Sequence, residues 1–212
     1  MQPNFFRLPV CVGDVTLRVA KGHFATNHSH INYLIDVTAQ KASLAEASAV
    51  AQQLAERHLS STLIDAILCL DGTRVIGTCL ARQLTQAGPR FINEGQDIFV
   101  LRDERGENGR ILFRDNARHM VEGKIVLILM ASVTTGETAA TSMESIRYYG
   151  GHVTGIAAIY SSLREMEGVE VSALFDLSDL PDYASYGAHQ CPLCKAGLPL
   201  EAVVNSFGYS VL

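Results

Sequence analysis

The chain has 212 residues with a formal net charge of −5, and 48% of them are hydrophobic against 18% charged. This size and composition predict one globular domain with at most a small appendage, and the negative charge argues against a broad nucleic-acid surface. The sequence shows no apolar run of bilayer-spanning length, no signal-peptide pattern and an odd number of cysteines, so we expect a cytoplasmic protein without a disulfide framework.

The first forty residues hold short extended segments, among them 15–19 and 31–37. Between these two segments lies a polar stretch with His23, His28 and His30. Three nearby histidines suggest a metal, but a histidine-rich tract alone specifies no ligand geometry. We therefore interpret the stretch as a solvated loop.

A first strand–loop–helix unit follows. Apolar residues at three- and four-residue steps predict a helix over 41–58, and 63–70 then reads as a buried strand followed by a helix over 75–86. The turn between strand and second helix consists of Asp71, Gly72, Thr73 and Arg74. Its backbone donors, hydroxyl and arginine lie at a helix N-terminus, an arrangement that suits an anion.

Residues 97–115 predict a β-hairpin arm, in which Asn108-Gly109 is a favoured turn pair. Positive charge is concentrated here, on Arg102, Arg105, Arg110 and Arg114. Two interpretations stay open for this arm. It is either a solvated hairpin or a mobile arm that closes over an anionic ligand.

The central segment alternates strands and helices. Residues 125–129 are all apolar, which is typical of a parallel strand covered on both faces. A helix over 138–149 and strands over 153–160 and 171–175 follow. This alternation predicts an open, mostly parallel α/β sheet, and such sheets bind ligands at the carboxyl ends of their strands.

The loop after the strand that begins at residue 125 has the chemistry of a phosphate site. Gly136 permits a tight backbone path, and the helix that follows attracts anions by its dipole. Hydroxyl donors are supplied by Ser132, Thr134, Thr135 and Thr138. The loop alone leaves a second interpretation open, a simple turn before a capped helix. The sequence contains neither a GxGxxG nor a GxxxxGK[ST] motif.

At this point the sequence resembles the type I phosphoribosyltransferases, in particular the orotate phosphoribosyltransferases. The resemblance rests on IVLILMASVTTGET, on YYGGHVTGIAAIY, on FATNHSHINYLIDV and on an arginine-containing hairpin before the main motif. It implies a mostly parallel α/β sheet flanked by helices, with a small hood. We accordingly divide the chain into a hood and entry segment (1–40), a core (41–175) and a tail (176–212) that can join the hood.

The resemblance also implies roles for individual residues. The 5′-phosphate of phosphoribosyl pyrophosphate would be wrapped by Ser132, Thr134, Thr135, Gly136, Glu137 and Thr138. The pyrophosphate loop would be Asp71, Gly72, Thr73 and Arg74. Arg102 and Arg105 would stand where the family has loop lysines that stabilise the leaving pyrophosphate. Mg²⁺ would accompany the substrate, and the protein would be a homodimer.

The sequence departs from the family at several places, among them Glu107 near the position of a loop histidine. Two of the departures affect groups that hold the ribose and the base. Met130 and Ala131 replace the acidic pair that holds the ribose hydroxyls, and Ser161-Ser162 replaces an acid and an arginine that contacts the base. We expect a protein that binds phosphoribosyl pyrophosphate or a nucleoside monophosphate and, if active, transfers phosphoribosyl to an orotate-like nitrogenous base. The alternative is a catalytically degenerate member that serves as a nucleotide sensor or assembly subunit.

The tail contains a second candidate site. His189, Cys191 and Cys194 form an H-x-C-x-x-C pattern, which supplies three ligands and is one short of a closed Zn²⁺ site. A redox pair and a plain pair of thiols are the alternatives. A zinc- or redox-dependent interaction module carried by this tail is therefore a third functional interpretation.

Overall fold

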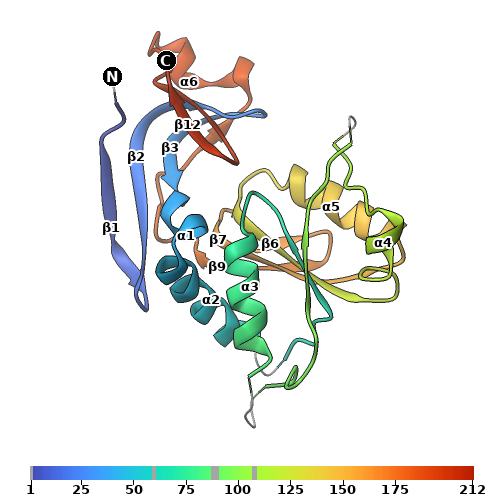
Figure 1. Cartoon of the computed structure of the whole chain (residues 1–212). Coiled ribbons are helices and arrows are strands. Elements are labelled where there is room, and N and C mark those ends of the chain that lie inside the picture. Colours follow the sequence, from blue (N-terminus) through green and yellow to red (C-terminus); the bar gives the residue numbers. More distant parts are fainter. Residues whose placement is uncertain (1, 59–60, 87–90, 107–108) are drawn as a thin grey trace.

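The computed structural model describes residues 2–58, 61–86, 91–106 and 109–212. The described residues form two six-stranded sheets, and helices pack on both faces of one of them (Figure 1). We refer to these as the central sheet and the terminal sheet.

The central sheet is mostly parallel, as predicted. Its strand order is β5-β4-β6-β7-β9-β8, and only the short β8 runs antiparallel to its neighbour. The strands are β4 (Ala66–Cys69), β5 (Phe99–Arg102), β6 (Ile125–Val133), β7 (His152–Ser161), β8 (Glu165–Met166) and β9 (Val169–Phe175). Strand β6 extends four residues beyond its predicted end, so Met130 and Ala131 belong to a strand.

Helices cover both faces of this sheet (Figure 1). Helices α2 (Leu44–His58) and α3 (Arg74–Leu84) pack on one face, where buried Leu54 and Leu80 join a core cluster with Leu129. Helix α5 (Glu137–Tyr148) packs on the other, where Met143 and Ile128 share a second cluster. Burying these apolar surfaces is the main driving force for the fold. No helix in the described ranges is long and apolar enough to cross a membrane.

The predicted helix over 41–58 is in fact two helices. Ser43 adopts an extended conformation (φ −86°, ψ 131°) and separates α1 (Thr38–Ala42) from α2. The break ends α1 just after Lys41, so Lys41 does not belong to the helix that continues as α2. A short helix, α4 (Asp115–Arg118), precedes β6.

The terminal sheet combines strands from both ends of the chain. Its order is β10-β3-β2-β11-β12, and β1 also pairs with β2. The strands are β1 (Phe5–Val12), β2 (Val15–Ala25), β3 (His30–Asp36), β10 (Ser185–Tyr186), β11 (Ala202–Asn205) and β12 (Gly208–Val211). A 3-10 turn, η1 (Ala188–Gln190), and the short helix α6 (Pro192–Lys195) connect β10 to β11.

The interpretation of residues 21–30 as a solvated loop is wrong. Strand β2 continues to Ala25 and β3 begins at His30, so only a tight turn separates them. His23 lies in β2 and is only 2% exposed. His23 and Phe24 are both buried, because the pairing of β2 with β3 shifts register between Lys21 and Phe24, and this irregularity breaks the alternation that a sequence pattern would reveal.

The hairpin predicted over 97–115 is also partly wrong. Strand β5 pairs in parallel with β4 and therefore belongs to the central sheet. The chain turns back only after β5, where Arg105 bridges Ile111 and Leu112 N–H donates to the Glu104 carbonyl at 2.8 Å. Of the predicted turn pair, Asn108 lies outside the described residues. An apolar strand is stabilised more by two covered faces than by an exposed hairpin.

Burial of His58 at the end of α2 makes a pH dependence of stability testable. Burial lowers the pKa of His58 from 6.5, and within the described chain its Nε2 has no hydrogen-bond partner. The unfolded state therefore binds the proton more readily than the folded state. The contribution of neutral His58 to the free energy of unfolding is complete above pH 6.5 and falls as the pH drops below that value. We expect the melting temperature to decrease between about pH 7 and about pH 5, and His58→Gln to flatten that decrease.

The matched control for this prediction is His152→Gln, because His152 is exposed at the start of β7. Thermal unfolding of the three proteins at several pH values is the measurement. An equal acid-side slope in the wild type and in His58→Gln would contradict the assignment.

Candidate functional site

A cavity of about 480 Å³ lies between the carboxyl edge of the central sheet and the terminal sheet. One wall is the end of β6 and the loop that leads to α5. The opposite wall is formed by the turn at residues 26–29, by β3 and by the β11–β12 turn. Of the predicted site residues, those that line the cavity are Asp71, Arg105, Ser132, Thr134, Thr135, Gly136 and Thr138.

The loop at residues 132–136 is held in a conformation that requires glycine. Gly136 has φ 80°, and a Cβ there would lie 1.6 Å from Met166 Cε. Its carbonyl accepts the first helical hydrogen bond of α5, from Ala140 at 2.9 Å. Among the residues that the structure describes, no side chain caps this helix terminus. The first N–H groups of α5 are consequently available to a ligand.

Ser162 supports this loop from behind. Its N–H donates to the Val133 carbonyl at 2.9 Å, and its hydroxyl donates to the Thr134 carbonyl at 2.9 Å. Tyr183 also lines the cavity; burial raises the pKa of its hydroxyl to about 12, and the neighbouring Thr134 side chain opposes this increase. The loop is thus fixed by contacts to the end of β7 and to the segment after β9.

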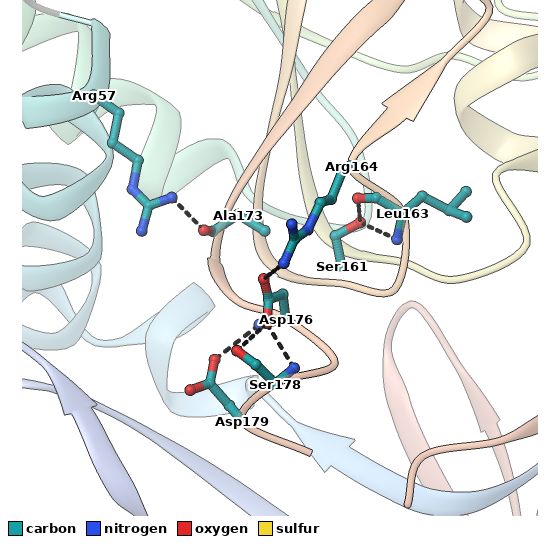
Figure 2. A network of polar contacts seen from close by, with 8 residues as sticks. All are labelled: Arg57, Ser161, Leu163, Arg164, Ala173, Asp176, Ser178 and Asp179. Atoms are coloured by element: carbon teal, nitrogen blue, oxygen red, sulfur yellow. Dashed lines mark hydrogen bonds and ion pairs between the residues drawn. The ribbon is translucent and has the colours of Figure 1, made fainter. Parts of the chain in front are cut away.

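Polar contacts also fix the neighbouring turns (Figure 2). Ser161 Oγ donates to the Leu163 carbonyl at 2.6 Å and accepts from Leu163 N–H at 3.0 Å. At the end of β9, Asp176 accepts from the hydroxyl and the N–H of Ser178, which hold the pKa of its carboxyl below the usual value. Arg164 pairs with Asp176 at 3.4 Å. The side chains of Ser161 and Ser162 therefore stabilise the backbone around the loop by hydrogen bonds.

Lys41 connects the turn after β4 to the β11–β12 turn, and sequence reasoning missed it. Its Nζ donates to the Asp71 carbonyl at 3.0 Å and to the Ser206 carbonyl at 2.6 Å. Burial lowers the pKa of Lys41, although Asp71 and Asp36 oppose this effect. In the sequence Lys41 reads as the first residue of an amphipathic helix, which gave no sign of a ligand contact.

Two carboxylates and an arginine face the cavity near Lys41. Asp71 follows β4 and Asp103 follows β5, and Arg105 Nε donates to Asp103 Oδ2 at 2.9 Å. Burial raises the pKa of Asp71, while the positive charges of Arg105 and Lys41 oppose the increase. The signal that identifies these acids is their position immediately after adjacent parallel strands, which brings them to one edge.

The predicted pyrophosphate loop reaches the cavity through Asp71 alone. Thr73 is fully buried, and its hydroxyl donates to the carbonyls of Leu70 (2.7 Å) and Leu129 (3.1 Å). That hydroxyl stabilises the turn, and its hydrogen is engaged by backbone carbonyls instead of a ligand. Within the described chain, Gly72 and Arg74 are exposed and outside the cavity lining.

Two further predicted residues lie outside the described cavity lining. Arg102 is exposed at the end of β5. Glu137 points to the terminal sheet, where its carboxylate lies 3.2 Å from His28 Nδ1. This pair connects the N-terminus of α5 to the turn at residues 26–29.

Met130 and Ala131 bring apolar surface to the cavity floor. They are 3% and 6% exposed. Met130 packs in the cluster on the α5 face, and Ala131 in the cluster on the α2–α3 face, as expected of successive strand residues. The carboxylates that the described part of this cavity offers are therefore those of Asp71 and Asp103.

The two tail cysteines lie beside histidines of the terminal sheet. The ligand atoms of His23, His30, Cys191 and Cys194 all lie within 4.8 Å of one another. His189, which the sequence pattern predicts as a ligand, is exposed and does not belong to this group. The predicted ligand set therefore differs from this group, to which strands β2 and β3, remote in sequence, contribute both histidines.

Comparison with known proteins agrees with the sequence resemblance. No family model matches. The chain is 27% identical over 155 residues to orotate phosphoribosyltransferase of Chlorobaculum parvum, covering 73% of this chain and 72% of that protein. It is 26% identical over 184 residues to the enzyme of the same name from Chlorobium phaeobacteroides, covering 86% of each.

Solved structures agree on the fold. Orotate phosphoribosyltransferase from Aeropyrum pernix superposes with a TM-score of 0.53 at 18% identity, over 84% of this chain and 92% of that one. A phosphoribosyltransferase from Corynebacterium diphtheriae gives 0.50 at 22% identity, over 77% and 90%. The chain has the type I phosphoribosyltransferase fold, and the predicted family resemblance is confirmed.

Proposed function

We propose that this relative of the orotate phosphoribosyltransferases binds phosphoribosyl pyrophosphate in the cavity and transfers the phosphoribosyl group to a nitrogenous base of the orotate class. The observation that carries the proposal is the uncapped N-terminus of α5, which opens with the loop at 132–136 into a cavity that also holds Lys41 and Arg105. The names of the sequence relatives support the choice of substrate.

The loop would hold the 5′-phosphate. The first N–H groups of α5 and the helix dipole favour a dianion at this point. The same cavity is lined by Ser132, Thr134, Thr135 and Thr138, whose hydroxyls would supply further donors. Because the backbone of this loop is already fixed by Ser162, binding requires little reorganisation.

The pyrophosphate would lie toward Arg105 and Lys41. Cationic donors that face the position where negative charge develops stabilise a leaving group most. Arg105 is the member of the predicted pair that lines the cavity, so we assign it the role expected of the family's loop lysines. Transfer would form the bond from the base nitrogen to ribose C1 and break the bond from C1 to pyrophosphate.

Mg²⁺ would be held by Asp71 and Asp103 together with the substrate's phosphates. This donor set fits, because Mg²⁺ prefers oxygen ligands and is commonly bound by one or two carboxylates plus phosphate. The ion would supply positive charge against the pyrophosphate. Met130 and Ala131 offer no ligand, so ribose orientation would depend on the loop and on the shape of the cavity.

Calorimetric titration with phosphoribosyl pyrophosphate and Mg²⁺ tests binding, and pyrophosphate release with orotate and other bases tests transfer. We expect both. If neither phosphoribosyl pyrophosphate nor a nucleoside monophosphate binds, the proposal fails. If phosphoribosyl pyrophosphate binds but no base releases pyrophosphate, transfer is refuted and the sensor alternative is supported.

The assembly and the location follow from the same proposal. A homodimer is the arrangement that the resemblance implies, and a cytoplasmic location is the default that the sequence pattern favours. Sedimentation of the full chain tests the dimer. A monomer at all concentrations would contradict it.

A further inference from the structure

We propose that His23, His30, Cys191 and Cys194 bind one zinc ion, which fastens the tail to the terminal sheet. The ligand atoms of this site lie outside the cavity, and the proposal does not rest on the transfer reaction. Two imidazoles and two thiols are a common ligand set of structural zinc sites.

The interatomic distances fit a tetrahedral ion. Zinc bonds of about 2.3 Å to sulfur and about 2.0–2.1 Å to nitrogen place sulfur and nitrogen about 3.6 Å apart, and two nitrogens about 3.4 Å apart. His23 Nε2 lies 3.5 Å from Cys191 Sγ and 3.6 Å from Cys194 Sγ. His30 Nδ1 lies 3.3 Å from Cys194 Sγ and 3.2 Å from His23 Nε2. Each separation is within a few tenths of an ångström of the tetrahedral value.

Hydrogen bonding alone does not account for this convergence. His23 Nε2 has three neighbours at these distances, yet an imidazole nitrogen carries one hydrogen or one lone pair and serves one good hydrogen bond. A metal ion accepts a lone pair from all four groups at once.

The second nitrogen of His23 is arranged as in metal sites. His23 Nδ1 lies 2.9 Å from the Leu198 carbonyl oxygen, which can only accept, so Nδ1 carries the hydrogen in the neutral ring. Nε2 is then unprotonated and directed at the cluster. A backbone carbonyl on the non-ligating nitrogen is the usual way to orient a metal-binding histidine.

The cysteine segment is already folded into a compact turn. Lys195 N–H donates to the Cys191 carbonyl at 3.2 Å, and Gly197 N–H donates to the Cys194 carbonyl at 3.0 Å. Gly197 has φ 74°, which closes the turn at a conformation that favours glycine. Both thiols are thereby presented from one side of a short segment.

The ion would also support one wall of the cavity. The tail continues from the cysteine turn into β11, which pairs with β2 through Ala202 and Phe24, and then into the β11–β12 turn at the cavity. Figure 1 shows α6 and β12 close to the upper ends of β2 and β3. Loss of the ion is expected to loosen this wall.

Metal analysis of the full chain tests the site. We expect about one zinc per chain in the wild type and at least about tenfold less in His30→Gln and in Cys194→Ser. The matched controls are His189→Gln and Cys11→Ser, which change an exposed histidine and an exposed cysteine outside the cluster and should keep the ion. The sequence pattern alone predicts the opposite for His189.

Cobalt substitution of the wild type gives a readout that needs no variant. Co²⁺ in the site should show thiolate charge-transfer bands and intense tetrahedral d–d bands. A chelator should lower the melting temperature of the wild type and leave that of Cys194→Ser unchanged. The proposal is overturned by a metal-free wild type, by a Cys191–Cys194 disulfide in its place, or by zinc that persists in both ligand variants.

Discussion

A Gly136→Ala variant is expected to bind phosphoribosyl pyrophosphate at least about tenfold more weakly than the wild type and to unfold at a lower temperature. A left-handed backbone at a non-glycine residue costs about 1–3 kcal/mol. The new Cβ would also lie 1.6 Å from Met166 Cε, so the flexible Met166 side chain has to rotate away, while the strained positive φ of residue 136 favours a shift of the loop backbone. Because the N–H groups of α5 begin at this residue, such a movement displaces the donors for the 5′-phosphate.

The control separates backbone strain from the loss of the site. Gly168→Ala changes another glycine with positive φ (78°), where a Cβ would meet nothing within 4 Å. We expect it to lose some stability and to keep its affinity. Titration and thermal unfolding of both variants are the measurements. Equal affinity in Gly136→Ala and the wild type would show that the phosphate binds elsewhere.

Arg105→Gln is expected to weaken the binding of phosphoribosyl pyrophosphate by about 10–100-fold, because a hydrogen bond to a charged group contributes about 1.5–3 kcal/mol. The same variant should bind ribose 5-phosphate as the wild type does, since that ligand lacks the pyrophosphate. Gly136→Ala, by contrast, should weaken both ligands. The pair of ligands therefore distinguishes the two ends of the proposed substrate.

Arg102→Gln is the matched control for this second prediction. Arg102 comes from the same segment and has the same charge, but it is exposed at the end of β5 and outside the cavity lining. We expect less than about a threefold change in affinity, the effect of an exposed charge. If Arg102→Gln lost as much affinity as Arg105→Gln, the placement of the leaving group beside Arg105 would be refuted.

Local sequence patterns determined much of the secondary structure of this protein. The apolar run at residues 125–129 predicts a parallel strand, and the Thr-Thr-Gly sequence that ends at Gly136 predicts a tight loop before a helix. Both features depend on residues a few positions apart, and the structure contains both. The mostly parallel sheet followed from the same alternation of strands and helices.

Other features depend on contacts between distant segments. Strand β5 reads as half of a hairpin, but the central sheet offers it two covered faces, and burial decides in favour of the sheet. Lys41 reaches the cavity because Ser43 breaks the predicted helix. Asp71 and Asp103 become a pair because β4 and β5 are neighbours.

The sequence alone therefore predicted the loop to which we assign the phosphate, because that loop is one local segment with one glycine. The tertiary structure decided what surrounds it and what holds the two ends of the chain together. The H-x-C-x-x-C pattern proposes His189, yet the packing of β2 and β3 against the tail brings His23 and His30 to the cysteines. Ligand geometry depends on distances in space, and those are set by strand pairing across about 170 residues of intervening chain.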